Sequence, residues 1–257
     1  MVDEVPLMLK TLDRLLARRV DAVVMGAPSE TIRAPAVMQR LERVPCVTIV
    51  SPEPIDDVRG DVIVHDRNVA IRQVVHHLAA TGRKRPAFFT SLEVPSNHSK
   101  LATFKDECAA CGIVPHPHLL LPINAKPKPT LEQPFSTDLD RYQNALNAAF
   151  PAGAPIPVDA IFTFNDLGAM AACNFVTERG LRVPDDVAIV GFNNDPAGAV
   201  WRPALATGCR RRAELAKAVE EMVFSRLRTP GLRPRRETIG MQFLWRKSAG
   251  GSAERCS

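Results

Sequence analysis

Two adjoining stretches decide the fold: DAIFTFNDLGAMAA at residues 159–172, and RGLRVPDDVAIVGF at residues 179–192. Each contains a short run of Ala, Val, Ile and Phe, which predicts a strand buried on both faces. Between the runs, apolar residues recur at helical spacing from Asp166 to Arg179, and Gly180 follows as a stop signal. A strand, a helix and a second strand in this order predict an α/β fold with doubly wound parallel sheets.

The same alternation extends in both directions from this segment. In doubly wound sheets ligands bind at the carboxyl ends of strands, so the residues after 90, 164 and 192 are the ones of interest. Residues 122–134 are rich in Pro and Lys and predict a loop. The other predicted strands are 20–25, 45–50, 61–65, 86–90, 119–121 and 237–245, and the other helices are about 6–19, 34–43, 68–81, 96–110, 136–150 and 213–227.

Composition excludes several classes of protein. Of the 257 residues 46% are hydrophobic, which excludes a disordered chain, and the net charge is only +5. No stretch approaches the ~20 apolar residues of a membrane span. Asp3, Glu4 and Lys10 interrupt the amino-terminal pattern of a secretory signal, and the six cysteines are scattered, so we expect a cytoplasmic protein. The basic runs 83–85, 210–212 and 233–236 are short, and we expect them to be solvated surface.

The sequence favours neither a metal site nor a catalytic one. Cys108 and Cys111, with His116 and His118, have some of the spacing of a zinc site, but a helix that ends at Gly112 explains the pair of cysteines better. We therefore expect no metal, no cofactor and no catalysis. The chain lacks GxSxG, GxGxxG, P-loop and HExxH motifs. An α/β hydrolase or isomerase stays open, because residues of a catalytic triad need not be close in sequence.

Residues 159–192 resemble the effector-binding region of the lactose/galactose repressor (LacI/GalR) family of bacterial transcription regulators. The resemblance rests on Asn165-Asp166 after a strand, on Arg179-Gly-Leu-Arg-Val-Pro184 and on Val190-Gly-Phe192, in this order. It extends over most of the chain, through 65–68, 78–89 and 96–104 upstream and through 203–207, 213–216 and 244–248 downstream.

The resemblance implies two α/β lobes of the periplasmic-binding-protein-like type I, joined by three crossovers. The expected first lobe is 1–64 plus 210–236, the second is 65–209 plus 237–248, and 249–257 form a flexible tail. The strand, helix and strand that open the family's first lobe have no counterpart here, nor does the helix-turn-helix headpiece. We therefore expect an incomplete first lobe, a chain truncated at its amino terminus, and DNA binding only through an absent headpiece.

The resemblance also implies a set of effector contacts, each with an alternative. Asn165 follows a strand and could equally cap the next helix, as we expect Asp166 to do. Lys100 stands where the family has an arginine, and Asn193 where it has a carboxylate. Phe135 could stack on a ligand ring or pack in the core, and Arg210 could face the ligand or the solvent. The expected effector-binding residues are Ser96, Lys100, Phe135, Asn165, Asn193 and Arg210.

The implied function is to bind a small effector, a sugar or polyol that is neutral or anionic, in a transcriptional regulator. The regulator would be a homodimer, with the opening helix and the helix at 213–227 as candidate dimer surfaces. The effector would favour one lobe arrangement and so change operator affinity. Two alternatives stay open: a periplasmic-type sugar-binding protein of the same fold, and the hydrolase or isomerase, which turnover of substrate would reveal.

Overall fold

The computed structural model describes residues 4–26, 29–50, 58, 60–90, 95–115 and 136–252. They form two compact units. Unit 1 takes the described residues up to Arg67 and those from Arg211 to Met241. Unit 2 takes those from Asn68 to Arg210 and those from Gln242 onward. The chain therefore passes between the units three times. Within the described ranges, each helix is too short or too polar to cross a lipid bilayer.

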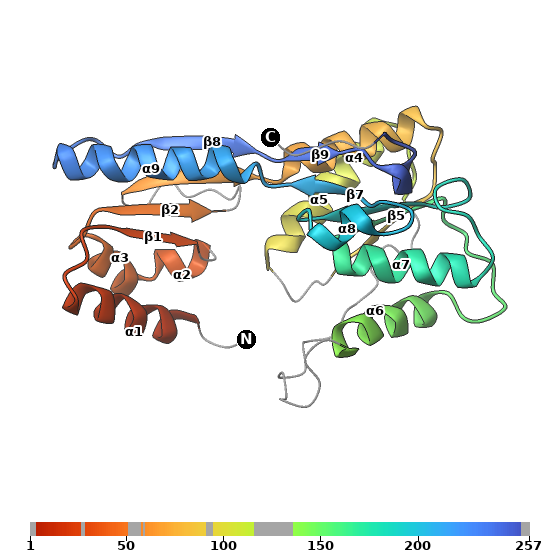
Figure 1. The fold of residues 1–257 in the computed structure, drawn as a ribbon, viewed down its shortest axis with the longest axis horizontal. Coiled ribbons are helices and arrows are strands. Elements are labelled where there is room, and N and C mark those ends of the chain that lie inside the picture. Colours follow the sequence, from red (N-terminus) through yellow and green to blue (C-terminus); the bar gives the residue numbers. More distant parts are fainter. Residues whose placement is uncertain are drawn as a thin grey trace. The chain divides into compact units, whose positions relative to one another are not determined.

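Unit 1 is a four-stranded sheet in the order β1-β2-β3-β8, and all its neighbouring strands are parallel. Helices α1, α2 and α3 cover one face, and α9 covers the other (Figure 1). Alternate residues of β2 face the two layers, because Cys46 packs on the α1 side and Val47 against Met222 of α9. The elements are α1 (Glu4–Ala17), β1 (Val23–Gly26), α2 (Ser29–Arg33), α3 (Pro35–Leu41), β2 (Cys46–Val50), β3 (Asp61–Asp66), α9 (Arg212–Arg228) and β8 (Arg236–Gly240).

A buried carboxylate fastens α9 to the sheet of unit 1. Asp61, at the start of β3, is fully buried and accepts hydrogen bonds from Arg226 Nη2 at 2.7 Å and Arg226 Nε at 2.9 Å. It also accepts one from the backbone N–H of Arg235 at 2.8 Å. Burial acts to raise the pKa of Asp61, but the hydrogen bonds from Arg226 and Arg235 outweigh it and hold the pKa below its usual range.

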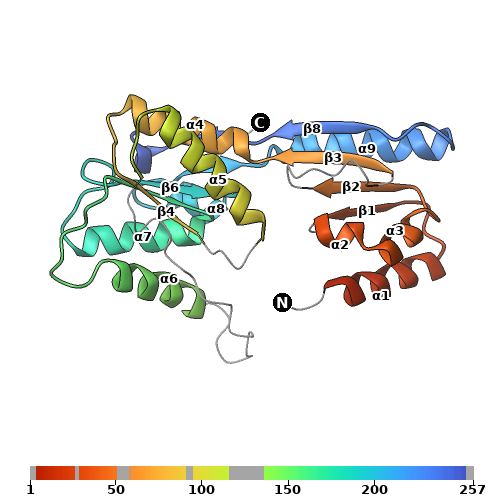
Figure 2. The same ribbon diagram turned by 180° about the vertical axis from the view of Figure 1, so that it is seen from behind.

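Unit 2 is a five-stranded sheet in the order β4-β5-β6-β7-β9. Helices α4 and α5 pack on one face, and α6 and α7 on the other (Figure 2). Stacked rings fill the α5 side, where the Phe88 ring centroid lies 5.3 Å from that of Phe104 and 4.7 Å from that of Phe162. The elements are α4 (Asn68–Ala80), β4 (Pro86–Phe89), α5 (Pro95–Ala110), α6 (Ser136–Ala149), β5 (Ala160–Thr163), α7 (Asp166–Glu178), β6 (Ala188–Phe192), α8 (Pro196–Val200), β7 (Ala206–Cys209), β9 (Gln242–Leu244) and the 3-10 turn η1 (Lys247–Ala249).

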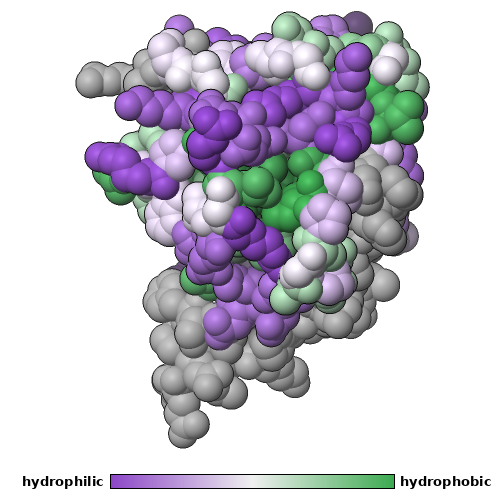
Figure 3. All heavy atoms as spheres, turned by 90° about the vertical axis from the view of Figure 1, so that its right-hand side faces the viewer, coloured by the Kyte–Doolittle hydropathy of each residue, from purple (hydrophilic) through white to green (hydrophobic). Residues whose placement is uncertain are grey.

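Figure 3 views unit 2 from the end where its parallel strands begin, and hydrophilic residues surround a smaller apolar area there. Arg83, in the segment that leads into β4, is half-buried and not simply solvated. Its guanidinium donates to the carbonyl oxygens of Asp159 at 3.1 Å and of Asp186 at 3.3 Å. The Asp159 carboxylate in turn accepts from the backbone N–H groups of Lys84 at 2.8 Å and Arg85 at 3.0 Å. Residues of the basic run 83–85 therefore link the segments that lead into β4, β5 and β6.

The structure corrects the expected lobe boundaries. The strand predicted at 237–245 is two strands broken at Met241: β8 pairs with β3 in unit 1, and β9 pairs with β7 in unit 2. Residues 237–241 therefore belong to the first unit and not to the second. Residues 65–67 do so as well, because β3 continues to Asp66. Residues 249–252 do not lie apart as a tail, since Ala249 is buried and its carbonyl bonds to His77 Nε2 at 2.8 Å.

Two further differences concern the elements themselves. The sheet of unit 2 is not wholly parallel, because β9 runs antiparallel to β7. The short elements α2, α8 and β7 were not predicted, since α2 and α8 are little longer than one helical turn and Thr207 and Gly208 interrupt the apolar run of β7. The strand predicted at 119–121 and the loop at 122–134 lie outside the described residues.

Replacing Asp61 tests the buried ion pair of unit 1. We expect Asp61→Ala to lower the free energy of unfolding by about 3 kcal/mol, because it leaves Arg226 without its buried partner. Urea denaturation followed by circular dichroism measures the change. Asp13→Ala, which removes the exposed partner of Arg40, serves as the control and should have a much smaller effect. Equal losses in the two variants would contradict the role given to Asp61.

Candidate functional site

Polar side chains gather at the carboxyl ends of the parallel strands of unit 2. Asn165 and Asp166 follow β5, the loop 193–195 follows β6, and Arg210 follows β7. In a parallel sheet these ends share one edge, so the chain order places the three groups side by side. Helix α5, which follows β4, adds Lys100 to the same edge.

Asn193, Arg210 and Lys100 converge on the end of β6. Arg210 Nη2 donates to Asn193 Oδ1 at 3.1 Å. The Lys100 side chain is buried, and its Nζ lies 5.0 Å from the ring centroid of Phe192, the residue before Asn193. Lys100 Nζ also donates to Asn97 Oδ1 at 3.1 Å. Of the six expected effector contacts, Asn193 and Arg210 are therefore hydrogen-bonded to each other, and Lys100 lies against the residue that precedes Asn193.

The loop that carries Asn193 has an unusual backbone. Asn193 has φ +101° and Asn194 has φ +53°, a region that asparagine tolerates better than most residues. Hydrogen bonds hold this conformation: the N–H of Asn193 donates to the carbonyl of Gly208 at 2.9 Å, and Arg246 Nη2 donates to Asn194 Oδ1 at 2.9 Å. The backbone of Asn193 is therefore anchored to β7, which leaves its side chain presented at the edge of the sheet.

The carboxylate of Asp166 holds this loop through hydrogen bonds. Its Oδ1 accepts from Thr207 Oγ1 at 2.6 Å, and its Oδ2 accepts from the N–H of Asp195 at 2.5 Å. The side chain is buried, and a Cβ added at Gly191 would lie 2.1 Å from Oδ1, so only glycine fits there. We expected Asp166 to cap a helix, and this was wrong. The carboxylate instead joins the end of β5 to β7 and to the loop after β6.

Asn165, not Asp166, is the helix cap. Its Oδ1 accepts from the N–H of Gly168 at 2.8 Å, and its Nδ2 donates to the hydroxyl of Tyr142 at 2.6 Å. Both ends of the amide are therefore occupied within the protein. The structure favours the capping alternative for Asn165 over the direct effector contact.

Two expected contacts cannot be placed, and two supporting residues were missed. Ser96 lies in α5, four positions before Lys100, but its side chain lies outside the described residues, as does all of Phe135. The sequence analysis overlooked Thr207, which holds Asp166, and Tyr142, which holds Asn165. Thr207 could have been noticed, because it is a polar residue within the otherwise small and apolar segment 206–209. Nothing in the sequence near Tyr142 indicates its role.

A hollow of about 790 Å³ in unit 2 lies away from these residues. It is formed by α4 and β9, and its wall includes His77 stacked on Trp245 with ring centroids 3.9 Å apart. None of the six expected effector contacts lines it.

The cysteine pair gives no support for a metal centre. Burial raises the pKa of the Cys108 thiol to about 12, so this side chain is a neutral part of the core. His116 and His118 lie outside the described residues. In the part of the chain that the structure describes, no three or more His, Cys, Asp or Glu side chains are grouped as metal ligands.

The titration of Asp166 gives a testable pH dependence. Burial raises its pKa to about 6 from an ordinary 3.8, despite the hydrogen bonds from Thr207 and Asp195. Between these two pH values the folded chain binds more protons than the unfolded chain, so acidification stabilises the fold through this group. We expect the unfolding free energy of the native chain, relative to Asp166→Asn, to rise by about 2–3 kcal/mol from pH 7 to pH 4. Urea titrations at several pH values measure it, and a constant difference would contradict the assignment.

Comparison with known proteins agrees with this geometry. The family model of the periplasmic binding protein-like domain matches residues 75–249. The HTH-type transcriptional regulator GntR of Escherichia coli strain K12 is 24% identical over 245 residues, which are 94% of this chain and 66% of that protein. This chain therefore spans slightly less than two thirds of that relative.

Solved structures show the same fold. The LacI family transcriptional regulator from Enterococcus faecium with bound ribose is 18% identical, with a TM-score of 0.72 over 96% of this chain and 85% of that one. The transcription regulator GntR from Chromobacterium violaceum is 23% identical, with a TM-score of 0.74 over 96% of this chain and 85% of that one. The chain belongs to the periplasmic binding protein-like domain family, and it corresponds to the effector-binding region of LacI/GalR-type regulators.

Proposed function

We propose that this chain is the effector-binding part of a cytoplasmic transcriptional regulator, and that it binds a sugar or sugar acid without chemical turnover. The observation that carries the proposal is the convergence of Lys100, Asn193 and Arg210 at the end of β6. A ribose-bound regulator of the same fold supports the class of ligand. DNA contact through a helix-turn-helix in the whole protein is a part of this proposal that the relatives' names suggest. A homodimer is a further part of it, which only the resemblance to the lactose/galactose repressor family implies.

The chemistry of the three side chains suits a hydroxylated ligand. The Asn193 amide can accept from one hydroxyl and donate to another, whereas Lys100 and Arg210 can only donate. Asn193 replaces the family's carboxylate, so two of the three side chains are positively charged and none of the three is negatively charged. That balance favours a ligand with its own negative charge, such as an aldonic acid, over the corresponding neutral aldose.

Lysine and asparagine also change the geometry of recognition. A guanidinium at the position of Lys100 would bind two oxygens in a fixed fork, whereas an ammonium acts as a point charge. Lys100 is held by Asn97 and lies over the Phe192 ring, so its charge is fixed in place even though its donors rotate. We therefore expect discrimination by charge to exceed discrimination among sugar stereoisomers.

Isothermal titration calorimetry with gluconate, glucose, ribonate and ribose tests the proposal. We expect an aldonic acid to bind more tightly than its aldose, with no product formed on prolonged incubation. Lys100→Met keeps the side-chain volume but removes the charge, and it should weaken aldonate binding by about 2 kcal/mol. Asn193→Ala should weaken binding of both ligand types.

Asn165→Ala is the matched control at the same edge. Because its amide caps α7, we expect a loss of about 1 kcal/mol in unfolding free energy and an affinity within about twofold of the native chain. Unchanged affinity in Lys100→Met and Asn193→Ala, with a large loss in Asn165→Ala, would contradict the site. Breakdown of a sugar ester or phosphate would instead indicate the hydrolase alternative.

A further inference from the structure

A separate surface lies in unit 1, at the edge of the sheet where the parallel strands begin. All four strands of this unit are parallel, so the segments that lead into them share one edge. The end of α3 leads into β2 here, and the end of α9 with the turn after it leads into β8. None of these segments contains an expected effector contact.

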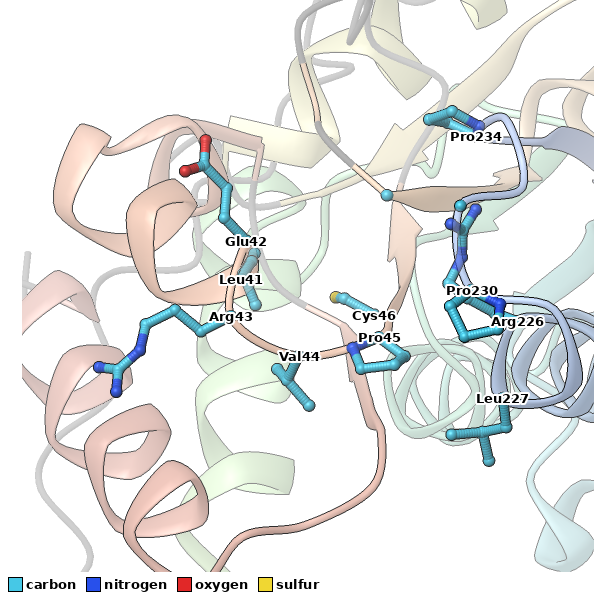
Figure 4. A pocket seen from close by; sticks show the side chains of 12 residues that line it. Leu41, Glu42, Arg43, Val44, Pro45, Cys46, Arg226, Leu227, Pro230 and Pro234 are labelled. Atoms are coloured by element: carbon cyan, nitrogen blue, oxygen red, sulfur yellow. The ribbon is translucent and has the colours of Figure 1, made fainter.

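A hollow of about 390 Å³ opens between these segments. Figure 4 shows Leu41, Val44 and Pro45 on one side of it, and Leu227 and Pro230 on the other. The lining is mostly apolar, with Cys46 between the two sides. The side chains of Glu42 and Arg43 point away from the hollow and form part of its rim.

An arginine-rich segment contributes one wall of this hollow, through Arg226, Leu227, Pro230 and Pro234. Residues 226–236 contain five arginines and no acidic residue. Arg226 is neutralised by the buried Asp61, whereas Arg228, Arg233 and Arg236 are exposed to solvent. Exposed arginines without lysines are typical of protein interfaces, where arginine is enriched and lysine depleted.

Exposed apolar side chains concentrate at the same place. Phe224 is 50% exposed, and Leu227 and Leu232 are each 38% exposed. Eight large apolar side chains are exposed among the described residues, and these three of the eight lie within one stretch of nine residues. Grouped exposed apolar residues mark interaction sites, whereas scattered ones need no explanation.

We propose that this face of unit 1 docks an acidic polypeptide segment, one apolar side chain of which enters the hollow. The arginines supply charge complementarity, and the lining of Leu, Val and Pro supplies a site for the anchor. Duplex DNA would match the charge but would leave the hollow and the exposed leucines unused. A second copy of the chain, meeting this face with the same face, would bring like charges together.

Fluorescence anisotropy tests the proposal with short labelled peptides that carry one central Phe, Leu or Ala among glutamates. We expect the Phe and Leu peptides to bind at least about tenfold more tightly than the Ala peptide. Reversal of the rim charge in Arg43→Glu/Arg228→Glu/Arg233→Glu should abolish binding. The matched control is Lys84→Glu/Lys105→Glu/Lys247→Glu, which makes the same change of charge on exposed residues of unit 2 and should leave affinity within about twofold.

Leu227→Lys separates an apolar anchor from simple attraction between charges. The added positive charge would strengthen binding of any polyanion, whereas loss of the apolar wall should weaken binding of the Phe peptide about tenfold. Leu7→Lys, at a residue that is 65% exposed on α1, is the control. Equal affinity for the Phe and Ala peptides, tighter binding of the Phe peptide by Leu227→Lys, or no peptide binding at about 1 mM would overturn the proposal. So would a dimer in light scattering that the three arginine reversals dissociate.

Discussion

The binding edge of unit 2 depends on one buried carboxylate. Asp166 lies where the side chain of any residue but glycine at 191 would be, and it accepts from Thr207 and from the backbone of Asp195. These bonds join three neighbouring strands at their carboxyl ends. The same loop holds Asn193 and Asn194 in a left-handed conformation, with the Asn193 amide beside Arg210. The Asp166 carboxylate, which is not a proposed ligand contact, thus helps to position the loop that carries the proposed contact Asn193.

The sequence predicted the fold well because burial on both faces of a parallel strand leaves a strong local pattern. The runs at 159–164 and 186–192 correspond to β5 and β6, and both the family and the strand-helix alternation are confirmed. The site was predicted less completely. Arg210 binds Asn193, and Lys100 lies against Phe192, but Asn165 and not Asp166 caps the helix, which is one of the two alternatives given for Asn165. Which of two adjacent polar residues caps a helix depends on partners, Tyr142 and Thr207, that are distant in sequence.

The charges of the chain have different environments in the two units. In unit 2, Lys100 is buried beside Phe192, and we assign it to a small ligand. In unit 1, a segment with exposed arginines forms one wall of a mostly apolar hollow, and we assign these arginines to a polypeptide. The basic run 233–236, expected to be plain solvated surface, acquires this second interpretation only because the fold places it beside Leu41 and Val44. Its sequence alone carries no sign of the hollow.

Hydrogen–deuterium exchange tests the central claim, that the ligand lies against the end of β6, most directly. The experiment compares the chain with and without gluconate at saturation. We predict slower exchange in the peptides that contain 193–195 and 210–211, and a smaller effect in Lys100→Met at the same gluconate concentration. Protection confined to the hollow between α4 and β9, with these peptides unchanged, would contradict the account.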